Sequence, residues 1–262
     1  MKASGNKEPI QVTLLANSGI ILEYNGTKLL IDGTPGEIHG YFSGLSEEVR
    51  KDLLEGKKPL FRDIDILMYT HCHHDHFSPE VTGALVEGQR TRCLMMPDRD
   101  SRPFVQLRES AILNETRLWL LDIPLGKIED YELDGIKIKA FRTMHAGEMY
   151  RETEHYCYLI ELGDKVILIT GDSDYDPDYF KTILSGIRIH AVFINPLFLN
   201  RREGRMALTE SIKPDKVVVC HIPFEGTPGT NLRKIAARDA VKHKEILPEI
   251  ILLQDELQEL VL

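Results

Sequence analysis

Four histidines within six residues constrain this chain more than any other feature of its sequence. They lie in the segment Thr70-His-Cys-His-His-Asp-His-Phe77, which contains the pattern His-x-His-x-Asp-His. Imidazole and carboxylate groups are good ligands for zinc and for neighbouring transition metals. The pattern therefore predicts a metal site in this part of the chain.

The position of the cluster between a strand and a helix indicates which of its side chains can bind the same ion. An apolar strand pattern at 64–69 precedes it, and Ser78-Pro79 provides a helix cap and first-turn proline after it. In extended backbone His71 and His73 point to the same side, so both can bind one ion. Asp75 and His76 follow as the chain turns and can reach a second ion. Cys72 and His74 are expected to point away from the first pair.

Three further candidates stand directly after strand patterns elsewhere in the chain. They are His145, Asp172 and His221, which follow the apolar stretches ending near Phe141, at Thr170 and at Cys220. Side chains at the ends of separate strands can converge on one point. We therefore predict that these three residues join the cluster around the metal site.

The remaining patterning predicts two β-layers covered by helices. Asn25-Gly26 between apolar runs is a strong hairpin signal, and Asp134-Gly135 and Gly163-Asp164 mark two more turns. Helices are expected at 47–54, from Ser78 to about 85, and at 231–243. Strands are expected at 10–15, 20–24, 28–31, 64–69, 131–141, 156–161, 165–170, 191–194, 216–220, 250–253 and 259–262. Without repeats, low-complexity stretches or a linker, residues 1–262 are expected to form a single domain.

Composition excludes several classes of function. The formal net charge of −9 disfavours binding to a nucleic-acid backbone. No apolar run approaches the roughly 20 residues of a membrane span, and the N-terminus lacks an apolar signal core, so a cytoplasmic protein is expected. The four cysteines are few for this length and are interpreted as reduced thiols.

With these residues in view, the sequence resembles the metallo-β-lactamase superfamily over nearly the whole chain. The resemblance rests on the hairpin ending in Leu30-Ile31-Asp32-Gly33, on the motif at 71–76, and on His145, Gly171-Asp172 and His221. It implies an α+β fold, a four-layer αββα sandwich with the metal site at one edge of the two sheets.

The resemblance also implies roles for individual residues. His71, His73 and His145 would hold a first ion, Asp75, His76 and His221 a second, and Asp172 would bridge the two. Asp32 would orient a metal ligand from behind. Asp75 and Asp172 would be the catalytic residues, with Asp75 orienting the nucleophile or passing a proton to the leaving group. Zinc is the first choice of metal, and manganese and iron suit the same mixed ligands.

The activity implied is hydrolysis by a metal-bound hydroxide, acting on a small-molecule ester, lactone or phosphodiester. The chain looks most like the branch of L-ascorbate-6-phosphate lactonase, although many members of that branch carry a histidine where this chain has Asn17-Ser18-Gly19. Asp172 argues against a true β-lactamase. Alternatives are a ribonuclease Z-like nuclease, a non-catalytic metal-binding regulatory module and, least favoured, an oxygen-reducing diiron protein.

Partners and substrate contacts are less constrained by the sequence. We expect a small-molecule substrate, no nucleic acid, no membrane, and assembly into a homo-oligomer as in the lactonase branch. Arg201 and Arg202 are candidate binding residues for a phosphate or carboxylate, with a solvated loop as the alternative interpretation. The segment 34–62 either covers the site or packs as a surface helix, and the second interpretation is preferred.

Overall fold

The computed structural model describes residues 8–38, 40–227 and 231–262. The chain begins with an antiparallel hairpin whose turn is Asn25-Gly26. Both turn residues have positive φ, 51° and 78°, which is the geometry of a type I′ turn and matches the twist of the flanking strands. A second hairpin turns at Asp134-Gly135 with φ values of 50° and 83°. The predicted hairpins at 25–26 and 134–135 are therefore confirmed.

The first sheet is mixed. In spatial order its strands are β14-β1-β2-β3-β4-β5-β6. β14, β1, β2 and β3 pair antiparallel, whereas β3 to β6 pair parallel. The bounds are β1 Gln11–Leu14, β2 Ile20–Tyr24, β3 Thr27–Ile31, β4 Ile66–Met68, β5 Cys93–Pro97, β6 Arg117–Leu121 and β14 Glu259–Val261.

The second sheet repeats this plan. Its spatial order is β13-β12-β11-β10-β9-β8-β7, with β13 to β10 parallel and β10 to β7 antiparallel. The bounds are β7 Ile128–Leu133, β8 Ile136–Thr143, β9 His155–Leu162, β10 Lys165–Ile169, β11 Ala191–Ile194, β12 Lys216–Val219 and β13 Glu249–Leu252.

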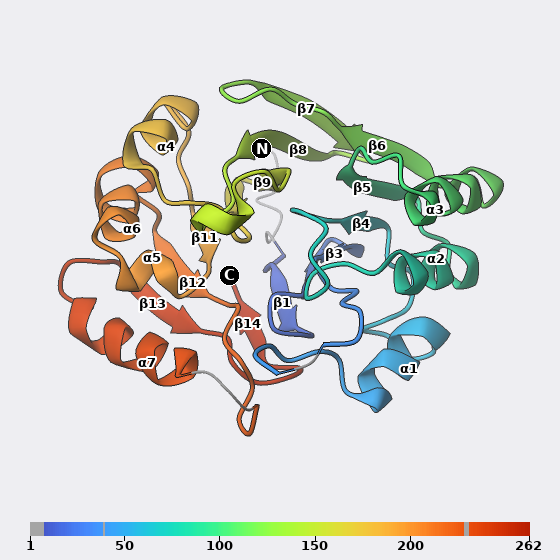
Figure 1. The fold of residues 1–262 in the computed structure, drawn as a ribbon, viewed down its shortest axis with the longest axis horizontal. Helices are drawn as coiled ribbons and strands as arrows, with labels where there is room; N and C mark the ends of the chain where they lie inside the picture. The colour runs from blue at the N-terminus through green and yellow to red at the C-terminus, as the bar shows by residue number, and fades with distance from the viewer. Residues whose placement is uncertain (1–7, 39, 228–230) are drawn as a thin grey trace, which may run out of the picture.

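Helices cover the outer face of each sheet (Figure 1). The helices α1, α2 and α3 lie on one flank, and α4 to α7 lie on the opposite flank. Their bounds are α1 Glu47–Glu55, α2 Pro79–Gly88, α3 Arg102–Leu113, α4 Pro177–Ile183, α5 Leu197–Asn200, α6 Arg202–Met206 and α7 Leu232–His243. Two short elements complete the set, the 3₁₀ turn η1 Glu148–Tyr150 and the π-helical turn η2 Ala207–Ile212.

Three apolar clusters hold these four layers together. One lies between the two sheets, and the other two lie between each sheet and its own helices. Period-two alternation assigns the side chains: Leu29 and Ile31 of β3 belong to the cluster between the sheets, while Leu30 packs toward the helices. The predicted four-layer αββα sandwich is confirmed.

Two stretches carry elements that the sequence patterns did not reveal. Residues 93–121 form β5, α3 and β6, and on either side of the predicted strand β11 residues 177–183 form α4 and residues 197–212 form α5, α6 and η2. The strand β5, Cys-Leu-Met-Met-Pro, is buried along its whole length, so it has no polar alternation to mark it. The segment 34–62 contains α1, which begins at the cap of Ser46, ends at Gly56 with φ 59°, and packs on the first sheet.

The topology brings the predicted site residues to one edge of both sheets. Asp32 and the histidine cluster follow the parallel strands β3 and β4, and Asp172 and His221 follow β10 and β12. His145 follows β8, whose last residue Thr143 pairs with His155 at the start of β9. No helix in the described part of the chain combines the length and the apolar character of a membrane span.

Candidate metal centre

Three imidazoles form a first donor group, defined as His71, His73 and His145. Their ring centroids lie 4.5 to 4.9 Å apart, and one ring nitrogen of each lies within 4.8 Å of the others. His71 and His145 are buried and His73 is half-buried. The expectation that His71 and His73 share a side is met, since Cys72 packs instead with the outer apolar cluster and His74 is exposed.

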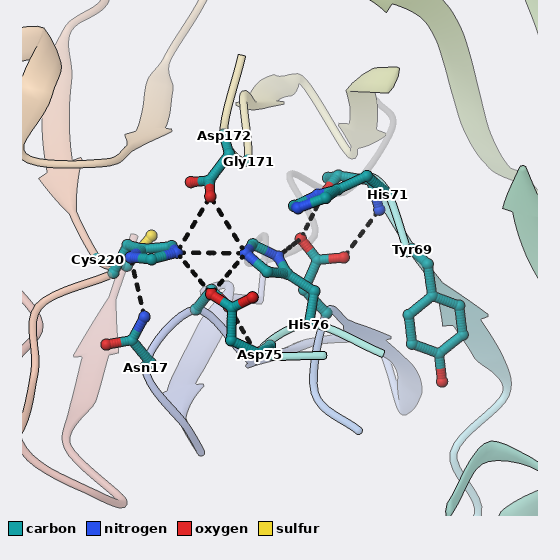
Figure 2. A network of polar contacts seen from close by, with 12 residues as sticks. Asn17, Tyr69, His71, Asp75, His76, Gly171, Asp172 and Cys220 are labelled. Atoms are coloured by element: carbon teal, nitrogen blue, oxygen red, sulfur yellow. Dashed lines mark hydrogen bonds and ion pairs between the residues drawn. The ribbon is translucent and has the colours of Figure 1, made fainter. Parts of the chain in front are cut away.

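The second donor group consists of Asp75, His76, Asp172 and His221, and Figure 2 shows it from close by. The Nε2 atoms of His76 and His221 are 3.2 Å apart. Asp75 Oδ2 lies 3.5 Å from His76 Nε2 and 3.2 Å from His221 Nε2. Two imidazoles and two carboxylates therefore converge on one small volume.

Asp172 lies between the two groups. Its Oδ2 is 3.5 Å from His76 Nε2 and 3.3 Å from His221 Nε2, and also 3.8 Å from His145 Nε2 in the first group. Backbone bonds hold this arrangement: Ala146 N–H donates to Asp172 O (2.8 Å) and Asp174 N–H donates to Met144 O (2.7 Å). The loops after β8 and β10 are thereby joined, and a carboxylate at this place can contact cations in both groups.

Asp32 supports the second group from behind. Its carboxylate accepts hydrogen bonds from Thr70 N–H (2.8 Å), from Thr70 Oγ1–H (2.6 Å) and from His76 Nδ1–H (2.9 Å). When the ring is neutral, the last bond keeps the proton on Nδ1 and leaves the lone pair of His76 Nε2 directed toward Asp75 and Asp172. Asp32 thus makes the contact that its predicted role requires.

Two rings of the first group are oriented in the same way. His145 Nδ1–H donates to the carbonyl of Ala146 (2.7 Å). His71 Nδ1 lies 3.0 Å from Thr70 Oγ1, and because that hydroxyl donates its own proton to Asp32, it accepts the proton of the ring. Both rings consequently present Nε2 inward.

The charges of the two groups differ. Burial lowers the pKa of His71 well below its ordinary value and lowers that of His73 to about 4, and burial also lowers the pKa of His145. The first group is therefore neutral near pH 7, the form in which imidazole binds a metal.

In the second group the neighbouring charges shift the pKa values more than burial does. Burial alone would lower the pKa of His221, but Asp172 and Asp75 raise it to about 9. In the same way Asp75 and Asp32 raise the pKa of His76. Burial would raise the pKa values of Asp75 and Asp172, yet His76 and His221 hold both below their usual range. In the absence of a cation, imidazolium groups offset the two carboxylates.

Two buried nitrogen atoms without hydrogen-bond partners in the described part of the chain indicate whether the donor groups fit a metal. His71 Nε2 and His145 Nε2 are buried and have no hydrogen-bond partner among the described residues. An unpaired buried polar atom costs roughly 1–3 kcal/mol, and here both atoms aim their lone pairs at the same place. A cation satisfies both, so the His/Asp cluster fits a metal.

Other predicted residues are placed away from the two groups. Arg201 and Arg202 are exposed at the start of α6, and no contact joins them to a metal-centre residue in the described structure. Their role in substrate binding stays a prediction. The four cysteines are free thiols, as expected. From the segment 34–62, Phe42 packs edge-on against His221, with ring centroids 4.9 Å apart.

His155 is the residue most closely tied to the site that sequence reasoning did not single out. It is fully buried, its Nε2 accepts from Asp172 N–H (3.0 Å), and its Nδ1–H donates to Thr143 Oγ1 (2.7 Å). Both ring nitrogens are thus engaged, which makes His155 a support for Asp172 and not a ligand. A histidine opening a strand ten residues after His145 is too common a pattern to identify it.

Gly171 permits the close approach of these elements. It has φ 51°, and a Cβ there would lie 2.6 Å from Thr70 Oγ1 and 2.9 Å from His155 Nε2. Only glycine lets the backbone before Asp172 pass between the two residues.

The comparison with protein families agrees with this geometry. Residues 11–221 match the family model described as the beta-lactamase superfamily domain. No curated protein is significantly similar in sequence.

Several solved structures share the fold at low sequence identity. CmlA, a diiron β-hydroxylase from Streptomyces venezuelae, has a TM-score of 0.66 and 18% identity over 98% of this chain and 54% of its own. The present chain thus spans about half of that protein. YhfI, a metallo-β-lactamase fold protein from Bacillus subtilis, has a TM-score of 0.61 and 16% identity, covering 97% of this chain and 100% of its own. Yeast PDE1 has a TM-score of 0.66 and 14% identity, covering 97% and 99%.

Proposed function

This chain belongs to the β-lactamase superfamily and carries a hydrolase-type metal site in a metallo-β-lactamase fold, and we propose that it is a hydrolase that uses two divalent metal ions. Its substrate class is a small-molecule ester, lactone or phosphodiester. Zinc is the preferred metal, with manganese and iron as alternatives, because imidazole and carboxylate ligands suit all three.

One observation carries this proposal, the joining of the two donor groups through Asp172. Its Oδ2 lies 3.8 Å from His145 Nε2 in the first group and 3.3 Å from His221 Nε2 in the second. His71, His73 and His145 would hold one ion, Asp75, His76 and His221 the other, and Asp172 would contact both. Divalent cations bound there lower the pKa of water toward neutrality and stabilise negative charge on a carbonyl or phosphoryl oxygen.

Individual residues of the chain are assigned the remaining roles in catalysis. Asp75 is assigned either to orient the attacking water by a hydrogen bond or to take a proton from that water and pass it to the leaving group. Asp172 keeps the two halves of the site at a fixed spacing, and His155 holds the backbone N–H of Asp172 in place (3.0 Å). No serine or cysteine nucleophile is needed; burial raises the pKa of Cys72 and of Cys220 to about 12, which disfavours a thiolate at either position.

The test compares chromogenic substrates on protein loaded separately with zinc and with manganese. An ester, a lactone and a phosphodiester are offered to the wild-type chain and to the variants His71→Ala and Asp172→Asn. We expect turnover of at least one substrate class, and a loss of at least about 100-fold in kcat/KM in both variants. Arg188→Ala is the matched control, because this exposed residue pairs with Asp215 before the strands β11 and β12, at the ends opposite the metal centre. A wild-type rate in either ligand variant would contradict the two-ion mechanism.

The same panel separates the narrower proposals. Opening of a phosphorylated sugar lactone would support the lactonase-like branch, whereas preference for a phosphodiester would direct the search to nucleotides and phospholipids. Cleavage of RNA would support the nuclease alternative. Full binding of two ions without turnover of any substrate would support the non-catalytic module, and oxygen consumption by iron-loaded protein would support a diiron oxidase or hydroxylase.

A further inference from the structure

Every histidine of the metal centre whose Nε2 faces inward has a partner at Nδ1. For three of these rings the partner is an oxygen atom: Asp32 for His76, Ala146 O for His145 and Thr70 Oγ1 for His71. An oxygen acceptor at Nδ1 places the ring proton there and keeps the lone pair on Nε2. The fourth ring, His221, follows a different arrangement.

The partner of His221 is the side-chain amide of Asn17. Asn17 is fully buried in the turn between β1 and β2, and its Nδ2 lies 2.8 Å from His221 Nδ1, 204 residues away in the chain. Figure 2 labels Asn17 and draws this contact of its amide nitrogen as a dashed line. Asn17 Oδ1 is buried and has no hydrogen-bond partner among the described residues.

The oxygen and nitrogen of a side-chain amide can exchange places by a 180° rotation, but the oxygen accepts hydrogen bonds and the nitrogen donates them. If Asn17 Nδ2 donated to Nδ1, a neutral His221 would carry its proton on Nε2, pointing at His76 Nε2 (3.2 Å) and at the carboxylates. That form has no lone pair for a cation. With the amide turned by 180°, Oδ1 accepts the Nδ1 proton, and His221 matches the other three rings.

The backbone gives a second reason to assign this role to Asn17. His221 has φ 60°, a left-handed conformation that is strained for a residue with a Cβ. Its N–H donates to Asn17 O (2.7 Å), and Asn17 N–H donates in turn to Ser43 O (2.9 Å). The turn at Asn17 therefore contacts both the main chain and the ring of His221.

We propose that Asn17 is a positioning residue for His221, whose side-chain oxygen accepts the Nδ1 proton and so directs the Nε2 lone pair into the second donor group. The inference rests on the proposed two-ion function. Asn17 is an uncharged acceptor, whereas His76 of the same group is supported by the carboxylate of Asp32. The two imidazoles of one ion thus differ in their support, and Asn17 provides the weaker acceptor.

The experiment measures metal content and affinity, not only turnover. Asn17→Leu removes the acceptor but keeps the branch at Cγ and the number of side-chain heavy atoms, and it leaves the backbone donors and acceptors of the turn in place. Asn17→Asp keeps an acceptor oxygen. Zinc is counted after dialysis against a weak chelator, in the variants, in the wild-type chain and in the control Thr116→Val, which removes a buried hydrogen bond to Thr91 O (2.9 Å) remote from the site. His71→Ala marks the first donor group.

We expect Asn17→Leu to bind one of the two ions 10- to 100-fold more weakly, a loss typical of a removed ligand support. Asn17→Asp should retain both ions, and Thr116→Val should match the wild type. The double variant His71→Ala with Asn17→Leu should bind both ions more weakly than the wild type, because each change acts on a different group.

Two results would overturn the role of Asn17: wild-type affinity for both ions in Asn17→Leu, or equal losses in Asn17→Leu and Asn17→Asp, which would indicate a packing role. A wild-type chain that does not bind two ions would overturn the proposed function itself, before any variant is compared. Circular dichroism of the metal-free variants checks that each has folded.

Discussion

Replacing Asp32 with asparagine should weaken the binding of one metal ion without unfolding the protein. Asp32 is 2% exposed, and its carboxylate accepts three hydrogen bonds of 2.6 to 2.9 Å from Thr70 and His76. Its φ of 50° is tolerated by asparagine, so Asp32→Asn changes the chemistry of the side chain and leaves the backbone unstrained.

The size of the expected losses follows from the hydrogen bonds that an amide can accept in place of the carboxylate. The amide oxygen can keep the bond from Thr70 N–H, and the amide NH₂ then faces Oδ2's former partners. Thr70 Oγ1 can turn to accept from it, but His76 Nδ1–H meets another donor. His76 must therefore move its proton to Nε2, the atom directed at Asp75 and Asp172. Loss of a charge-assisted bond costs about 1.5–3 kcal/mol of folding stability, and loss of ligand support lowers metal affinity about 10- to 100-fold.

Isothermal titration with zinc and thermal unfolding of the metal-free protein measure these two effects separately. Asp65→Asn is the matched control, since Asp65 also accepts a backbone N–H, that of Lys28 (2.9 Å), but lies at the opposite ends of the same strands. We expect Asp32→Asn to lose affinity for one ion and the control to keep both. Two ions bound by Asp32→Asn with wild-type affinity would refute the tautomer argument.

Four further predictions concern His221, Gly171 and the four thiols. The pKa of His221 is raised from 6.5 to about 9 in the folded protein. The protonated ring therefore stabilises the metal-free protein fully below pH 6.5, and this stabilisation is lost as the pH rises through 9. The Tm of chelator-treated protein should fall between these two pH values. For the same reason zinc binding at pH 7 should release protons, detectable as a dependence of the titration enthalpy on the buffer, and an equal heat in all buffers would contradict it. Gly171→Ala should destabilise the fold by about 2–4 kcal/mol and reduce zinc content, because its Cβ would meet Thr70 and His155 at a positive φ; an unchanged denaturation midpoint would disprove this. Burial raises the pKa of all four thiols to about 12, so native protein at pH 8 should react with a disulfide reagent only after unfolding, and a rapid burst of thiol release would show otherwise.

Local signals were sufficient for much of the fold. The Asn25-Gly26 turn and the Ser78-Pro79 cap each act through the conformations that a few adjacent residues allow, so each could be predicted in place. The strand β5 could not, because it is buried on both faces and has neither the period of a helix nor that of a half-exposed strand.

The candidate site shows the same division. The donor chemistry follows from the order of residues in the chain: histidines and aspartates stand at the ends of strands, in an order that permits two ions. Which atoms face inward depends instead on contacts between residues far apart in the chain. Asp32 meets His76 across 44 residues, His155 meets Asp172 across 17, and Asn17 meets His221 across 204. Such contacts depend on which strands become neighbours, and neighbouring strands are chosen by the packing of the whole core, which no local pattern encodes.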